Sequence, residues 1–181
     1  MNYFEADLEK ANDFHGHICS GIVLGVRMAR IGLNYLGIED TLQNRNFVVY
    51  VEADRCIADA VHSVTGCSLG KRRLKWMDYG KMAASFIDIN SNTGVRIVVN
   101  GQHNAPENGD IVPFWTSITD EELFKLEPVR VKLGLEDLPG KSLGRAKCVS
   151  CGEKIMDGRE LVLDQNILCK ACAGGAYYEK L

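Results

Sequence analysis

Four cysteines near the C-terminal end of the sequence have the spacing of a metal site. They form two Cys-x-x-Cys pairs separated by 17 residues, Cys148 with Cys151 and Cys169 with Cys172. Each pair can supply two thiolates to one edge of a tetrahedron, and Zn²⁺ prefers four thiolates in a closed structural site. A redox dithiol and an iron–sulfur cluster are the alternatives for this pattern. The spacing favours structural zinc over both, and seven cysteines, an odd number, argue against a disulfide framework.

A second cluster lies near the N-terminus, where His15, His17 and Cys19 occupy alternate positions just before an apolar run. Alternate residues of extended backbone project to one side. The His-x-Cys pair of His17 and Cys19 can therefore chelate a metal ion, or place an imidazole beside a thiol and lower the pKa of that thiol. The alternative is that one histidine hydrogen-bonds locally and Cys19 is an inert core residue.

A third set of reactive side chains follows a predicted strand. Cys56, Asp59 and Ser63 are spaced by three and four residues, which places them on one face of a helix. Beyond this helix, Cys67 lies in a glycine-bounded loop that continues into the basic run 71–73. That run is either a solvated patch or a rim that binds an anion.

The elements that would position these residues form an α+β core. Apolar residues between Ile18 and Leu36 recur at helical offsets, and Gly21 and Gly25 share a face where another backbone can come close. Four further elements are predicted: a strand from Phe47, a helix capped by Asp54 that ends at Gly66, a hairpin around the turn 91–94, and a helix that begins at Thr119.

A Gly- and Pro-containing stretch before the cysteine pairs marks a linker. We place the domain boundary near residue 140, with a core domain over 1–140 and a four-cysteine zinc-finger domain over 141–181. The segment between the pairs is predicted to form a hairpin with a turn at Asp157 and Gly158. A module this small needs its metal ion to fold.

Composition indicates a folded, soluble protein. The chain has 181 residues, of which 46% are hydrophobic and 25% charged. Its N-terminal segment is acidic and lacks the apolar stretch of a signal peptide, and no apolar run is long enough to span a bilayer. We therefore expect a cytoplasmic protein without membrane contact. The net charge is −3, and from residue 141 onward seven Lys and Arg face five Asp and Glu, so a nucleic-acid partner is not favoured.

The chain resembles the FmdE-like family, the E subunit of formylmethanofuran dehydrogenase, in its longer form with a zinc finger. The resemblance rests on the cysteine module and on two segments, "FHGHICSGIVLGVRMA" and "EADRCIADAVHSVTGCSLGKRRLKWMDYGKMAASF". The resemblance covers nearly the whole chain. It implies an α+β core, a treble-clef zinc module and a tightly associated, intertwined homodimer. The family pattern Gly-His-x-Cys-Pro-Gly carries onto Gly16, His17, Cys19 and Gly21, with Ser20 in place of proline. The second motif carries onto Asp54, Cys56, Asp59, Ala60, Thr65, Gly66, Cys67, Gly70 and Lys71.

The family name implies a link to methanogenesis-related C1 metabolism, beside a molybdenum or tungsten enzyme that reduces carbon dioxide to a formyl group. The sequence has no pterin-cofactor fingerprint and no ferredoxin-type cysteine run. Whether this chain catalyses a reaction therefore stays open, and we interpret it as an accessory or stand-alone relative.

Two hypotheses follow. In the first, His17, Cys19 and Cys56 form a core site for a second metal ion or a reactive thiolate, with Asp59 and Cys67 nearby and Lys71 drawing a small anionic ligand. These six residues are the catalytic candidates. In the second, the protein is an interaction or regulatory protein whose zinc finger binds a partner protein or nucleic acid while the core only dimerises. The exposed basic residues of the finger would then matter most: Lys147, Lys154, Arg159 and Lys170.

Overall fold

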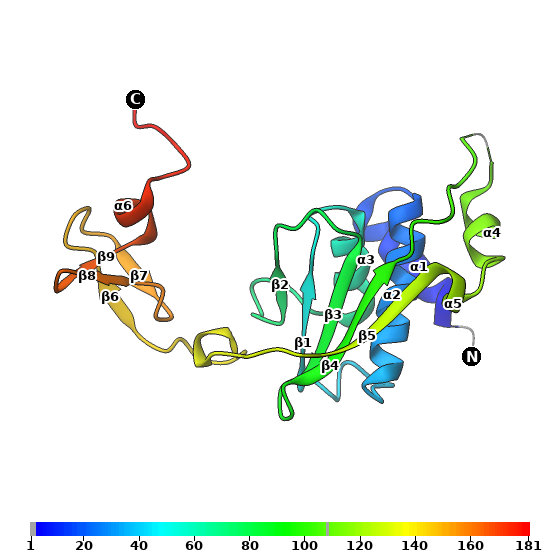
Figure 1. Ribbon diagram of the computed structural model, residues 1–181, viewed down its shortest axis with the longest axis horizontal. Coiled ribbons are helices and arrows are strands. Elements are labelled where there is room, and N and C mark those ends of the chain that lie inside the picture. Colours follow the sequence, from blue (N-terminus) through cyan, green and yellow to red (C-terminus); the bar gives the residue numbers. More distant parts are fainter. Residues whose placement is uncertain (1–2, 108) are drawn as a thin grey trace. The chain divides into compact units, whose positions relative to one another are not determined.

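The computed structural model describes residues 3–107 and 109–181 (Figure 1). The chain divides into two compact units, one that ends at Leu133 and one over Gly134–Leu181. The predicted boundary near residue 140 falls inside the second unit. No helix of the described residues has the length and apolar character needed to cross a membrane.

The first unit is built on one five-stranded sheet with the strand order β2-β1-β3-β4-β5. Strands β1 and β2 are parallel, and every other neighbouring pair is antiparallel. The parallel pair is connected through helix α3, as a βαβ crossover requires. The predicted α+β class is confirmed, with these strands: β1 (Phe47–Val51), β2 (Leu74–Trp76), β3 (Ala83–Asp88), β4 (Thr93–Val99) and β5 (Phe124–Arg130).

Three helices, α1 (Tyr3–His15), α2 (Ser20–Tyr35) and α3 (Cys56–Thr65), lie on one side of this sheet (Figure 1). Apolar side chains of α2 and α3 meet alternate residues of β1, β3 and β4, in keeping with the two-residue period of a strand. Helix α1 has no counterpart among the elements predicted from the sequence. Fully buried residues of this core include Ile22, Val26, Ile57, Phe47, Phe86 and Ile97.

Helices α2 and α3 pack with their backbones in close approach. A methyl group added to Gly25 would lie 2.6 Å from the Cβ of Ala60, and one added to Gly21 would lie 2.9 Å from the Cβ of Cys56. The predicted role of these two glycines is confirmed. Because each contact pairs residues 35 positions apart in the same direction, the helices run parallel and their N-termini lie together.

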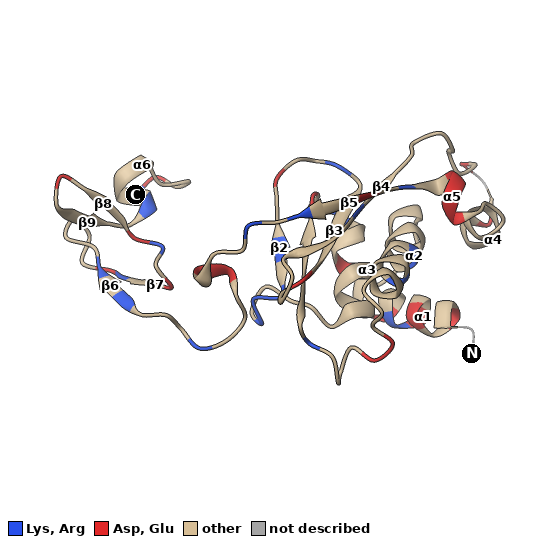
Figure 2. Cartoon of the chain, turned by 60° about the horizontal axis from the view of Figure 1, so that its bottom comes forward, with Lys and Arg blue, Asp and Glu red and all other residues tan. Residues whose placement is uncertain are grey.

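Two short helices, α4 (Ile111–Thr116) and α5 (Asp120–Leu123), precede the edge strand β5. The Thr119 cap is confirmed: its hydroxyl accepts from the Glu122 N–H, and Glu122 in turn reaches back to Thr119. Asp and Glu fill the first turn of α5 (Figure 2), where they complement the helix dipole. Strand β5 begins directly after Leu123, so this helix is only four residues long.

The second unit contains a 3₁₀ turn, η1 (Leu135–Asp137), two small hairpins and a terminal helix, α6 (Lys170–Gly174). Strand β6 (Arg145–Lys147) pairs with β7 (Lys154–Met156), and β8 (Leu161–Leu163) pairs with β9 (Asn166–Leu168). A hairpin does form between the cysteine pairs, as predicted, but its turn is not at Asp157 and Gly158. Both residues have positive φ and do turn the chain, but β7 and β8 pair with other strands, and the tight turn lies at Asp164 and Gln165.

Candidate functional site

The four cysteines of the second unit converge as the spacing predicts. The sulfur atoms of Cys148, Cys151, Cys169 and Cys172 all lie within 4.8 Å of one another. The first pair follows β6 and the second brackets the start of α6, so a hairpin and a helix N-terminus each supply two sulfurs. Four thiolates leave no open position on a tetrahedral ion, which makes this a structural zinc centre.

The backbone prepares one of these sulfurs for a metal ion. The N–H groups of Cys151 and Cys169 lower the pKa of the Cys148 thiol to about 6. The pKa of the Cys151 thiol is raised to about 12, because lost solvation and the neighbouring thiols outweigh the opposing Glu153 N–H. Zinc binding displaces the protons that the other thiols carry.

The N-terminal cluster of the first unit also comes together. Helix α1 ends at His15, the chain turns at Gly16 with a φ of +91°, and Cys19 is the N-cap residue of α2. One ligand atom each from His15, His17 and Cys19 lies within 4.8 Å of the others. The two imidazole rings have a centroid separation of 4.6 Å. Two nitrogens and one sulfur are thus presented to one small volume.

His15 is held by a carboxylate on α3. Its Nδ1 donates a hydrogen bond of 2.8 Å to Asp59 Oδ2, which leaves Nε2 as the acceptor nitrogen. Nε2 is buried and has no hydrogen-bond partner in the described part of the chain. A histidine that binds a metal ion normally donates its other ring N–H to a carboxylate in this way.

Cys19 and Cys56 stand at the N-termini of the parallel helices α2 and α3. A methyl group at Gly21 would lie 3.5 Å from Cys56 Sγ and 3.8 Å from Cys19 Sγ, so only glycine leaves this space free. Burial raises the pKa of the Cys56 thiol, and the hydrogen bond and charge of Cys19 raise it further.

The predicted cap of α3 by Asp54 is wrong. Arg55 is the N-cap residue of α3, and its side chain makes no cap hydrogen bond.

Cys67 and Lys71 lie beyond the opposite end of α3. The helix has ten residues, so at the usual rise its two ends are about 15 Å apart. Cys67 is fully buried, and burial raises the pKa of its thiol. Lys71 is exposed and its Nζ donates to the Gly66 carbonyl at 3.4 Å. The structure therefore does not bring these two residues to Cys19 and Cys56.

The third residue of the basic run 71–73 belongs to neither of the two surfaces considered for the run, because it is buried. Arg73 is 6% exposed, its guanidinium lies 4.4 Å from the centroid of the Phe47 ring, and its Nε donates to the Phe47 carbonyl. Arg73 is thus a core residue.

His15 is absent from the ligand set predicted from the sequence, His17, Cys19 and Cys56, although it precedes His17 by only two residues. The pairing of His15 with Asp59 joins residues 44 positions apart. Only the packing of α1 on α3 creates that pair.

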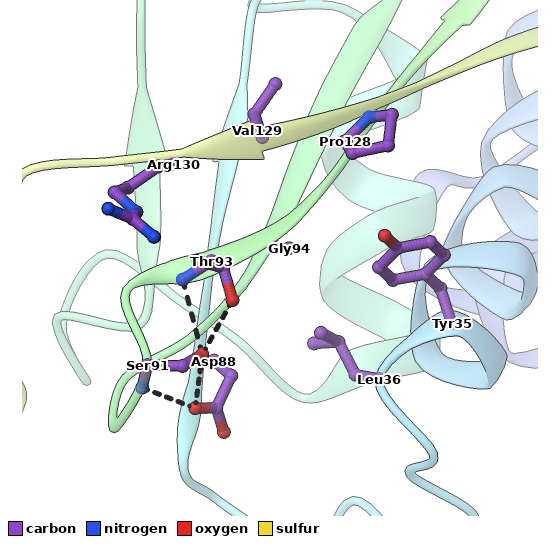
Figure 3. Close-up of a pocket in the computed structure, with 9 residues that line it drawn as sticks. All are labelled: Tyr35, Leu36, Asp88, Ser91, Thr93, Gly94, Pro128, Val129 and Arg130. Atoms are coloured by element: carbon purple, nitrogen blue, oxygen red, sulfur yellow. Dashed lines mark hydrogen bonds between the residues drawn. The ribbon is translucent and has the colours of Figure 1, made fainter.

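Two cavities of the first unit are candidates for a ligand-binding site. One of about 420 Å³ lies beside the cluster and is lined by His15, Cys56 and Asp59. The other, of about 530 Å³, lies at the C-terminal end of α2, where Tyr35 faces Asp88, Ser91 and Thr93 (Figure 3). None of the sequence-predicted site residues lines the second cavity, and its Asp88 carboxylate is bonded to Ser91.

Comparison with known proteins agrees with this geometry. Residues 141–178 match the prokaryotic dksA/traR C4-type zinc finger family. A probable S-adenosyl-L-methionine-binding protein of Archaeoglobus fulgidus is 30% identical over 201 aligned positions, which cover 94% of this chain and 53% of that protein. The chain thus spans about half the length of this relative.

The fold is shared with a solved structure. A tungsten formylmethanofuran dehydrogenase E-subunit (FmdE)-like protein from Syntrophus aciditrophicus superposes with a TM-score of 0.64 at 23% identity, over 97% of this chain and 95% of that chain. Residues 14–125 match the family described as "FmdE, Molybdenum formylmethanofuran dehydrogenase operon". The match spans His15 to Lys71 and most of the sheet, and the chain belongs to the FmdE family, with a C4 zinc finger attached.

Proposed function

We propose that the first unit binds a transition-metal ion through His15, His17 and Cys19, in addition to the structural zinc of the second unit. The observation that carries this proposal is the buried, unpaired Nε2 of His15, whose ring is oriented by Asp59. An unpaired buried nitrogen is costly unless a ligand satisfies it. A metal ion supplies that ligand.

The donor set suits Zn²⁺ or a neighbouring first-row ion. Two imidazoles and one thiolate resemble the ligands of catalytic zinc sites, which keep a fourth position for water or substrate. Cys56, a ligand in the sequence-based prediction, is not among the residues whose ligand atoms lie within 4.8 Å of one another. Its thiol lies beside Cys19 and borders the fourth position. A metal ion with an open position acts as a Lewis acid on a bound oxygen.

We place the protein in C1 metabolism at the level of formyl groups and carbon dioxide, as an accessory or stand-alone member of its family. Family membership supports this assignment. The proposed core metal site adjoins a cavity of about 420 Å³, so a metal ion bound there would be accessible to a small substrate.

Metal content per chain tests the site directly. Elemental analysis of the full chain should give about two metal ions, and Cys19→Ser should give one. His103→Ala is the matched control, because His103 lies in the loop between β4 and α4 and should leave both ions in place. A single ion in all three proteins would show that only the zinc finger binds metal.

A second function is favoured by the apolar surface of the second unit. Val149, Val162 and Leu163 are 63%, 66% and 48% exposed, on or beside the β8–β9 hairpin. Apolar side chains gathered on a small unit mark a protein-binding surface. In this alternative the finger binds a partner protein while the core dimerises. Val162→Ser would then abolish partner capture and leave the metal content unchanged.

A further inference from the structure

The cavity beside the core cluster has a free cation at its edge. It is lined by His15, Asp54, Arg55, Cys56, Ala58 and Asp59. Arg55 is exposed, and among residues 3–107 and 109–181 its guanidinium makes no hydrogen bond and no ion pair. Three charged residues and His15, a ligand of the proposed metal site, thus line one cavity.

Arg55 is placed by the start of α3. It is the N-cap residue, with an extended backbone (φ −119°, ψ −177°), and Cys56 follows as the first helical residue. The guanidinium is therefore attached one residue from a thiol of the core cluster. Because no side chain caps this helix, its first N–H groups add positive potential at the same place.

We propose that this cavity binds a small monocarboxylate, with the carboxylate on Arg55 and a second oxygen of the same molecule toward the core metal site. This inference rests on the proposed function. A guanidinium binds a carboxylate through two parallel hydrogen bonds, which fixes the orientation as well as the position of the ligand.

The charges around the cavity favour a monoanion over a dianion. Asp59 and Asp54 both line it. Asp59 is engaged with His15, but Asp54 is exposed and has no partner among the described residues. Each added negative charge on a ligand is repelled by these carboxylates. Inorganic phosphate should therefore bind less well than a monocarboxylate of similar size.

In this proposal Arg55, and not Lys71, is the residue that binds the anion. Lys71 lies beyond the far end of α3 and reaches the Gly66 carbonyl, whereas Arg55 shares a cavity with His15 and Cys56. Lys71 therefore serves as the matched control, since replacing it also removes one positive charge from the first unit.

The test uses the full chain with zinc in its finger and Co²⁺ in the core. Cobalt absorption is followed during titration with lactate, and the spectrum of Cys19→Ser is subtracted to remove any cobalt in the finger. We expect lactate to change the spectrum, with a dissociation constant raised about tenfold or more in Arg55→Gln and unchanged in Lys71→Gln. Asp54→Asn should lower the dissociation constant for lactate.

Two comparators show whether charge is the cause. Lactamide has the shape of lactate without its charge, and inorganic phosphate carries more charge. Equal binding of lactamide and lactate, equal binding by Arg55→Gln and the wild type, or tighter binding of phosphate would overturn the carboxylate site while leaving the metal site intact. Failure to bind core cobalt at all would overturn both proposals.

Discussion

Asp59 on α3 accepts a hydrogen bond of 2.8 Å from His15 Nδ1, and this contact fixes the tautomer of the last residue of α1. The proton on Nδ1 leaves a lone pair on Nε2, which is buried and without a partner among the described residues. His17 and Cys19 present their ligand atoms within 4.8 Å. One carboxylate therefore determines which nitrogen of the cluster is available to a metal ion.

Asp59→Asn should weaken the core metal site and spare the zinc finger. An amide accepts a hydrogen bond less strongly than a carboxylate, and loss of such an orienting partner typically costs about 10 to 100-fold in metal affinity. The measurement is a competition titration with a chromogenic chelator. Asp13→Asn is the control, because Asp13 is exposed and its replacement removes the same charge two residues from His15. Equal affinities for the two variants would contradict the orienting role of Asp59.

Local patterns predicted much of the fold. The helix that ends at Gly66 does so in the left-handed conformation that glycine favours, with a φ of 66°. The turn 91–94 joins β3 and β4 as expected, with Asp88 accepting from the Ser91 N–H. The spacing of the four cysteines also predicted their convergence. Each of these features depends on residues that are close in sequence or on a strict metal geometry.

The core site was predicted only in part, because its geometry depends on packing between helices. Cys56 and Cys67 belong to one motif in the sequence, yet the straight α3 holds them at opposite ends. Conversely, His15 and Asp59 meet because α1 packs on α3. The turn predicted at Asp157 does not close a hairpin either, because β7 pairs with β6 and β8 pairs with β9.

Gly25→Ala should destabilise the first unit. Its new methyl group would lie 2.6 Å from the Cβ of Ala60 and 3.2 Å from the Cα of Ile57, so α2 and α3 must separate. Overpacking of this kind costs about 1–3 kcal/mol, which outweighs the gain of about 1 kcal/mol in helix propensity. Urea unfolding measures the difference. Gly70→Ala is the control, since nothing lies within 4 Å of its added methyl group.

If Gly25→Ala proved as stable as the wild type, the close approach of the two helices would be disproved. Core metal affinity should fall in parallel with stability in this variant, because the same approach holds Cys56 beside Cys19.

Arg96→Met should be among the most destabilising changes on the sheet face away from the helices. The guanidinium of Arg96 bonds Glu52 through Nε at 2.6 Å and Nη2 at 2.8 Å, and Glu52 is only 5% exposed. Removing the cation leaves a buried carboxylate unpaired, at a cost of about 3 kcal/mol in the free energy of unfolding. Arg96→Met combined with Glu52→Leu should recover most of this loss.

Lys125→Met is the matched control for Arg96. Its ammonium group bonds Glu127 at 2.8 Å, but the side chain is 67% exposed, so the loss should stay below about 1 kcal/mol. A similar loss for Arg96→Met would show that Glu52 is solvated rather than dependent on its partner.

Zinc removal should unfold the second unit and leave the first folded. The buried apolar residues that the second unit contributes, among those the structure describes, are Cys148 and Ile155, which cannot form a core without the metal ion. After chelation, hydrogen exchange at the Val149 N–H, bonded to the Ile167 carbonyl, should accelerate about 100-fold or more. Exchange in α2 and β3 should stay slow, because their apolar core needs no metal.

Cys169→Ser should reproduce the effect of zinc removal, whereas Met156→Ser, at an exposed position of the same unit, should not. Protection of Val149 that survives complete zinc removal would show that the hairpins fold by themselves.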